Sequence, residues 1–189
     1  DLNLIFLLDK NNRIIAFSPL SKKFQPNILE ISPEAQINSL GTYLTYLYVL
    51  DSTTNQIYRY PRAEGGFGAG KSWLKETMDL SSVKDMAINE NIFVSEPDRI
   101  IKMFKGQKQD FTVEKTVTPI SFDKIYTPEG ATEIYILDKT NSRIIQLESG
   151  GNILKQFYNE KIGQAEDIAV NGSDIYFINE KTIYSFSFN

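Results

Sequence analysis

The stretch that decides the fold is Ile134-Tyr135-Ile136-Leu137-Asp138-Lys139-Thr140-Asn141-Ser142-Arg143-Ile144-Ile145. It contains an apolar run, a polar turn that begins at Asp138, and a second apolar run that follows Arg143. Short apolar runs rich in Ile and Tyr and bounded by turn residues are typical of β-strands. The stretch therefore predicts two neighbouring strands joined by a short turn.

The same pattern occurs five times along the chain. The first strand of each copy lies at Leu4–Asp9, Leu47–Asp51, Ile92–Glu96, Ile134–Asp138 and Ile175–Asn179. The last residues of these strands are 42, 45, 42 and 41 positions apart. A further strand precedes four of the copies, at Gln36–Leu40, Asp85–Ile88, Asp123–Tyr126 and Asp167–Val170, and a weaker one follows some of them, as at Asn152–Phe157. Four strands in about 42 residues is the period of a β-propeller blade.

We therefore predict an all-β protein, a β-propeller of four-stranded antiparallel blades with about five blades. It forms a single domain over residues 1–189, with repeat units of roughly 1–33, 34–82, 83–120, 121–163 and 164–189. The first unit lacks its inner strand, and the last unit ends after its third strand. The five blades could therefore close into a ring by themselves or belong to a larger ring. The segment 71–80 has some helical character, but the repeat phase favours an outer strand there. Because the chain begins bluntly at Asp1, we expect it to be part of a longer protein.

The residues Asp138 to Ile145, which follow Ile134–Leu137, resemble the NHL-repeat signature, and so does Asp167–Val170. NHL repeats are similar to those of the gluconolactonase-like propellers. The resemblance covers essentially the whole chain, although shorter turns at Ser95–Asp98 and Asn179–Lys181 depart from it. It implies a propeller and says little about activity. The chain also resembles propellers that are joined through a membrane segment to phosphatase domains in some bacteria, which implies an extracytoplasmic domain of a membrane-anchored bacterial protein.

Composition narrows the possible chemistry. The 20 Lys and Arg and 24 Asp and Glu residues give a net charge of −4, which argues against nucleic acid as a partner. No apolar run approaches the roughly 18–20 residues that span a bilayer, so we expect no membrane insertion of this domain, and we expect a monomer. The chain has no Cys and no His, which excludes thiol nucleophiles, Ser-His-Asp triads and His or Cys metal sites. Any catalysis would have to use carboxylates, Lys, Tyr or an oxygen-ligated metal.

Three aspartates are candidate metal ligands. Asp85, Asp123 and Asp167 each open an inner strand, and Gln36 has the equivalent place in its unit. Inner strands line the central channel of a propeller, so these side chains could meet at its mouth. Oxygen ligands suit Ca²⁺ or Mg²⁺, and Gln36 is a candidate ligand-binding residue for a small polar molecule. The alternative is that each aspartate bonds to the backbone of a neighbouring blade and that no cofactor is present.

A second group of aspartates has a simpler interpretation. Asp9, Asp51 and Asp138 end the second strand of their units, where a carboxylate can accept hydrogen bonds from turn amides. We expect these three residues to build turns rather than to share a site.

The segment Gly65–Ser72 matches the P-loop string G-x-x-x-x-G-K-S, but the strand before and the long helix after that a P-loop requires are missing. We expect a glycine-rich hairpin loop instead. Trp73 lies beside this loop and is a candidate ligand-binding aromatic, although packing of the loop on its own blade is the favoured alternative. The lysines of 102–115 are interrupted by acidic residues, which favours a solvated outer edge over a nucleic-acid patch.

These observations favour a non-catalytic recognition or scaffold propeller that binds a protein, a glycan or a small polar ligand on its loop face or at its channel mouth. One alternative is a divalent-metal lactonase-like hydrolase, as the gluconolactonase resemblance implies. Another is a glycosidase that uses a pair of the channel-mouth aspartates. A third possibility is a purely structural module of a larger envelope protein.

Overall fold

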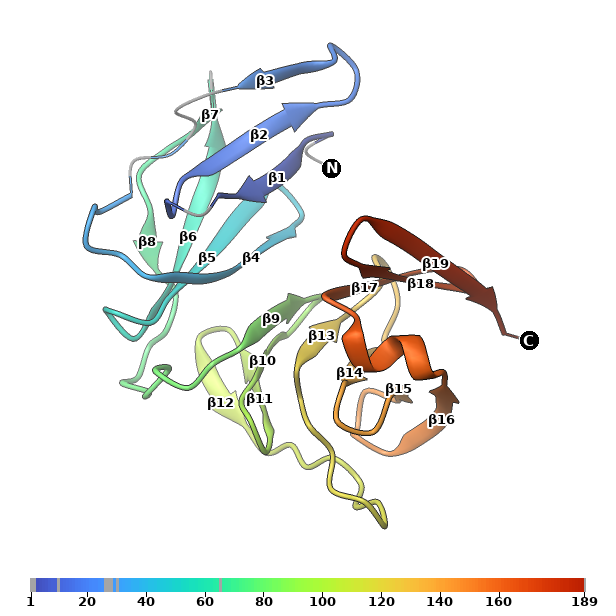
Figure 1. Ribbon diagram of the computed structural model, residues 1–189. Coiled ribbons are helices and arrows are strands. Elements are labelled where there is room, and N and C mark those ends of the chain that lie inside the picture. Colours follow the sequence, from blue (N-terminus) through green and yellow to red (C-terminus); the bar gives the residue numbers. More distant parts are fainter. Residues whose placement is uncertain (1–2, 10, 26–28, 30, 65, 189) are drawn as a thin grey trace. The chain divides into compact units, whose positions relative to one another are not determined.

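The computed structural model describes all residues except 1–2, 10, 26–28, 30, 65 and 189 (Figure 1). Its described part is almost entirely β-structure, in five small antiparallel sheets that follow one another along the chain. These sheets correspond to the five repeated units, so the all-β prediction and the predicted blades are confirmed.

The chain forms two compact units. The first comprises residues 1–82 with 105–107, and the second comprises residues 83–104 with 108–189. The division after residue 82 coincides with the predicted boundary between the second and third repeats. The single domain over the whole chain therefore stays a prediction.

The first unit contains two blades. One has the strand order β1-β2-β3 and, within the described residues, no inner strand, as predicted. The other has the order β4-β5-β6-β7, with β8 also paired to β6. The bounds of these strands are β1 (Ile5–Leu8), β2 (Ile14–Ser18), β3 (Lys23–Gln25), β4 (Ile37–Tyr43), β5 (Tyr46–Asp51), β6 (Gln56–Ala63), β7 (Gly66–Phe67) and β8 (Lys71–Ser72).

The second unit contains three blades with the orders β12-β11-β10-β9, β13-β14-β15-β16 and β17-β18-β19. The last blade has three strands, again as predicted. The bounds are β9 (Asp85–Ile88), β10 (Ile92–Ser95), β11 (Ile100–Phe104), β12 (Gln107–Gln109), β13 (Lys124–Tyr126), β14 (Ile134–Asp138), β15 (Arg143–Leu147), β16 (Ile153–Tyr158), β17 (Asp167–Asn171), β18 (Asp174–Asn179) and β19 (Thr182–Ser187). A 3-10 helix, η1 (Glu160–Gln164), lies between β16 and β17 and was not predicted.

Apolar side chains hold neighbouring blades of the second unit together. Phe93 and Ile100 of one blade share a core with Ile134 and Ile145 of the next. A second core joins that blade to β17 and β18 through Leu137 and Phe177, among others. The inner strand β13 contacts both β9 and β17. Blades of this kind are stable because each buries the apolar face that its neighbour presents.

The repeated Asp residues build the turns between the second and third strands. Asp138 accepts hydrogen bonds from the backbone N–H of Asn141 at 3.2 Å and from Nε of Arg143 at 2.6 Å. Asp9 accepts from the backbone N–H groups of Asn11 at 2.8 Å and Arg13 at 2.9 Å. Asp51 accepts from the N–H of Thr53 at 3.0 Å. The prediction of turn-building aspartates is confirmed.

The outer edge of the second blade departs from the predicted single fourth strand. Two-residue strands β7 and β8 both pair with β6, at different places along it. The interruption lies in the glycine-rich segment, where a Cβ on Gly70 would come within 2.5 Å of the Tyr60 ring. The described residues 73–84, directly after Ser72, form no helix, so the segment is a hairpin edge rather than a P-loop.

Candidate functional site

Two of the predicted metal ligands form reciprocal ion pairs between neighbouring blades. The sequence has Lys84-Asp85 at the start of β9 and Asp123-Lys124 at the start of β13. Lys84 Nζ lies 2.8 Å from Asp123, and Lys124 Nζ lies 3.6 Å from Asp85. Asp85 also accepts a hydrogen bond from the backbone N–H of Ile125 at 3.2 Å. The two aspartates therefore tie one blade to the next.

The surroundings of Asp123 stabilise its ionised form. Burial alone would raise the pKa of Asp123, but hydrogen bonds from Lys84, Ser121 and the backbone N–H of Lys139 outweigh it and lower the pKa. Asp167 is exposed, and its carboxylate accepts from the N–H of Ile168 at 2.9 Å. Among the residues that the structure describes, no group of three or more acidic side chains is placed to hold a metal ion. A Ca²⁺ or Mg²⁺ site at these aspartates stays a prediction.

The two predicted ligand-binding residues lie in the first unit. The backbone N–H of Gln36 donates to Asp51 at 3.0 Å, and the side chain of Gln36 is exposed. Trp73 is half-buried and packs edge-on against Tyr48, with 6.2 Å between ring centroids. Its backbone N–H donates to the carbonyl of Ile57 at 2.8 Å. Trp73 thus contacts its own blade, and a ligand role for either residue stays a prediction.

A groove of about 900 Å³ lies in the second unit. One side is formed by 97–101, at the start of β11, and the other by the chain from 108 to 122; we call it the 97–122 groove. Its apolar lining consists of Ile100, Ile101, Phe111, Val113, Ile120 and Phe122. Asp98, Arg99, Lys108, Asp110, Glu114 and Lys115 add charges of both signs around it.

The groove exists because the outer strand of its blade is short. β11 has five residues, and β12 has three. β11 and β12 are neighbours in the sheet and are joined by a turn at Lys105 and Gly106. The longer β11 therefore extends past the last residue of β12, at Ile100 and Ile101. Beyond Gln109 the chain runs away from the sheet without forming a strand until Lys124.

Contacts with its own blade and with the next blade hold this departing segment in place. Phe111 packs edge-on against Phe93, with 5.7 Å between ring centroids. The backbone N–H of Glu114 donates to the carbonyl of Gly151 at 2.9 Å, and the N–H of Ile153 donates to the Glu114 carboxylate at 2.8 Å. A Cβ on Gly151, where φ is +99°, would come within 2.2 Å of a backbone oxygen of this segment.

Arg143 anchors the far end of the same segment. Its side chain is 2% exposed, and its guanidinium donates to the carbonyl of Thr118 at 3.2 Å and to Gln156 at 2.8 Å. Burial alone would lower the pKa of Arg143, but hydrogen bonds to Tyr158 and Asp138 outweigh it and raise the pKa. Arg143 therefore stays charged while it joins the repeated turn to one wall of the groove.

Sequence reasoning missed this groove because it treated 102–115 as a solvated edge. A signal was present: fourteen residues separate Gln109 from Lys124, with apolar side chains spaced along them. A connection of that length between strands is often functional.

Comparison with known proteins shows the fold. No family model and no curated protein sequence matches the chain. A chain of the nidogen/laminin complex is similar in structure, with a TM-score of 0.72 and 18% identity over 97% of this chain and 73% of that chain. Virginiamycin B lyase from Staphylococcus aureus has a TM-score of 0.55 and 12% identity over 99% of this chain and 64% of its own. The extracellular domain of BT4673 from B. thetaiotaomicron has a TM-score of 0.59 and 11% identity over 99% of this chain and 25% of its own.

These likenesses establish the fold and not the activity, because all three identities are low. The protein has the β-propeller fold, as predicted. Similarity to NHL-repeat or gluconolactonase-like proteins in particular stays a prediction. Within the described residues, no helix has the length and apolar character needed to cross a membrane.

Proposed function

We propose that this protein is a recognition propeller without catalytic activity of its own, which binds an extended segment of a protein partner in the 97–122 groove. The observation that carries the proposal is the apolar groove beside the start of β11, which extends past β12. A peptide that continues in the direction of β12 could bond to the edge of β11 and place alternate side chains on Val113 and Ile120. Addition of a strand to a sheet edge is a recurrent mode of peptide recognition.

Charges around the groove favour a peptide over a small apolar molecule. Arg99, Lys108 and Lys115 line the groove together with Asp98, Asp110 and Glu114, so the rim carries both signs and no large net charge. An apolar centre with a mixed polar rim is the usual anatomy of a protein interface. The similar chain from the nidogen/laminin complex supports the same choice, because that structure is a complex of two proteins.

The comparison with lyases argues against the same lyase chemistry in this chain. A variant of virginiamycin B lyase in which a histidine is replaced by alanine is catalytically inactive. This chain contains no histidine, so it has no residue of that type to supply the same chemistry. The extracellular domain of BT4673 supports an extracytoplasmic location for this chain as well.

Selection of random linear peptides displayed on phage tests the proposal, followed by affinity measurement with the synthetic peptides recovered. We expect Val113→Glu to abolish binding of these peptides, because it places a charge on the apolar floor. The matched control is Leu154→Glu on β16, where the wild-type side chain is already 50% exposed and lies outside the groove.

Circular dichroism establishes that both variants are folded. If Val113→Glu does not fold, the double variant Lys108→Glu/Lys115→Glu takes its place, since both lysines are exposed. Failure to recover any peptide, or equal binding by wild type and the groove variant, would overturn the proposal.

A further inference from the structure

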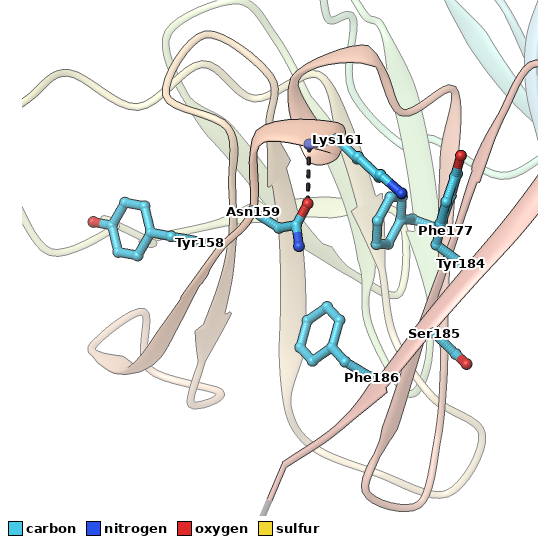
Figure 2. A pocket seen from close by; sticks show the side chains of 7 residues that line it. All are labelled: Tyr158, Asn159, Lys161, Phe177, Tyr184, Ser185 and Phe186. Carbon is cyan, nitrogen blue, oxygen red and sulfur yellow. Dashed lines mark hydrogen bonds between the residues drawn. The ribbon is translucent and has the colours of Figure 1, made fainter.

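A separate cavity of about 330 Å³ lies between the last two blades of the second unit (Figure 2). Its side chains come from three places: Asn159 follows β16, Lys161 is on η1, and Phe177, Tyr184 and Phe186 are on β18 and β19. Tyr158 and Ser185 also border the cavity, but Figure 2 shows their side chains pointing away from it. The first five side chains therefore determine what the cavity can bind.

Aromatic rings form the apolar wall of the cavity. Phe177 lies opposite Tyr184 in the register of β18 and β19, and the two rings stack with centroids 5.2 Å apart and planes 20° apart. Phe186 lies two residues further along β19 and so shares the face of Tyr184. The Phe186 ring rests against Phe157 of the preceding blade, with centroids 5.6 Å apart. Contacts from both blades thus fix the rings before any ligand arrives.

Two hydrogen-bond donors lie beside these rings. Lys161 Nζ is 4.2 Å from the centroid of the Tyr184 ring. Asn159 Oδ1 accepts from the backbone N–H of Lys161 at 3.0 Å, which fixes the orientation of the amide. Figure 2 shows the amide nitrogen of Asn159 directed toward Phe186. The cavity therefore combines a cation and an amide donor with a flat apolar surface.

We propose that this cavity binds a carboxylate-bearing pyranose, that is, a uronic acid unit of a glycan. The C–H face of the sugar ring packs on Phe186, because the negative face of an aromatic ring attracts partly positive C–H groups. The Tyr184 ring instead holds Lys161 above it. The sugar carboxylate accepts hydrogen bonds from Lys161 and from the Asn159 amide. A cavity of this size is at the lower end of the range for small-molecule sites and suits one substituted six-membered ring.

Because the whole protein carries a net negative charge, the attraction of an anionic ligand to this cavity depends on the nearby cation, Lys161. The net charge is −4, so no general attraction draws an anion to this protein. Lys161 is the cation that lines the cavity, and no acidic side chain is among the lining residues. A neutral sugar could accept a hydrogen bond from Lys161 through a hydroxyl oxygen, but it would lack the charge pairing that a carboxylate gains. An aromatic carboxylate would use the cation but has no C–H face to place on the rings.

Saturation-transfer NMR with methyl glucuronide, methyl glucoside and benzoate as probes tests this assignment on the full chain. We expect transfer to the ring protons of the glucuronide and weaker binding of both other probes. Lys161→Gln should weaken glucuronide binding by about tenfold or more, to the level of the glucoside, because it removes a charge-assisted hydrogen bond.

Lys181→Gln is the matched control, because Lys181 is an exposed lysine of the blade that carries Tyr184 and lies outside the cavity. It should leave glucuronide binding unchanged. Lys161 is itself exposed, so its variant should melt at the wild-type temperature. The proposal fails if the glucuronide shows no transfer, if the glucoside binds as tightly, if benzoate binds more tightly, or if Lys161→Gln has no effect.

Discussion

Replacement of Arg143 by methionine should destabilise the second unit by about 3–5 kcal/mol, because it leaves the Asp138 carboxylate buried without its cation. The Arg143 side chain is 2% exposed and that of Asp138 is 0% exposed, so water cannot replace the lost partner. The variant also removes the donor to the Thr118 carbonyl at 3.2 Å. It should therefore loosen one wall of the 97–122 groove as well as lower stability.

Three further variants determine whether the buried charge is the cause. Asp138→Asn in the Arg143→Met background should recover part of the lost stability, since it neutralises the orphaned carboxylate. Lys84→Met should cost only about 0–1 kcal/mol, because the Lys84–Asp123 pair is partly exposed, at 35% and 22%. Arg143→Lys keeps the charge, so its stability should lie between those of wild type and Arg143→Met. This variant can still be measured if the methionine form does not fold.

Urea unfolding followed by far-ultraviolet circular dichroism measures these free energies, with the slope against urea checked for constancy across variants. The reasoning is refuted if Arg143→Met costs no more than Lys84→Met. It is also refuted if Asp138→Asn adds to the damage of Arg143→Met instead of relieving it.

Three other perturbations test separate features. Gly70→Ala should cost about 1–3 kcal/mol by overpacking against Tyr60, whereas Gly68→Ala, whose new Cβ would lie 3.4 Å from Pro61, should cost much less in the same urea assay. The pKa of Asp123 is lowered in the folded state, so its stabilising effect is present above the unfolded value of about 3.9 and is lost as pH falls through the folded value. The difference in urea midpoint between wild type and Asp123→Asn should accordingly be largest near neutral pH and shrink in acid; a constant difference would contradict this. Finally, Ca²⁺ or Mg²⁺ should not raise the melting temperature, because lysines already pair with Asp85 and Asp123; a metal-specific rise that disappears in Asp85→Asn/Asp123→Asn/Asp167→Asn would establish the metal site instead.

The strands and turns could be predicted from the sequence because their determinants are local. A run such as Ile134–Leu137 followed by Asp138 specifies a strand and its turn within one short segment. The inner strand at Asp85–Ile88 was predicted with the bounds that the structure shows. The helix at Glu160–Gln164 was missed, since a single 3-10 turn held by the Asn159 cap has no periodicity to detect.

Interactions between blades were not predictable in the same way, because they join residues that are far apart in the chain. The sequence showed Lys84-Asp85 and Asp123-Lys124 as two charged pairs, and it could not show that each aspartate meets the lysine of the other pair. Likewise, nothing in the sequence indicated that Asn159, Lys161 and Tyr184 would line one cavity.

The sequence by itself thus determined an all-β chain of repeated blades, because strand patterning and turn chemistry act over a few residues. Only the tertiary structure decided where a ligand could bind. The 97–122 groove depends on where β12 stops relative to β11, and the aromatic cavity depends on β19 packing against the preceding blade. Both follow from long-range packing of side chains, which local residue preferences do not encode.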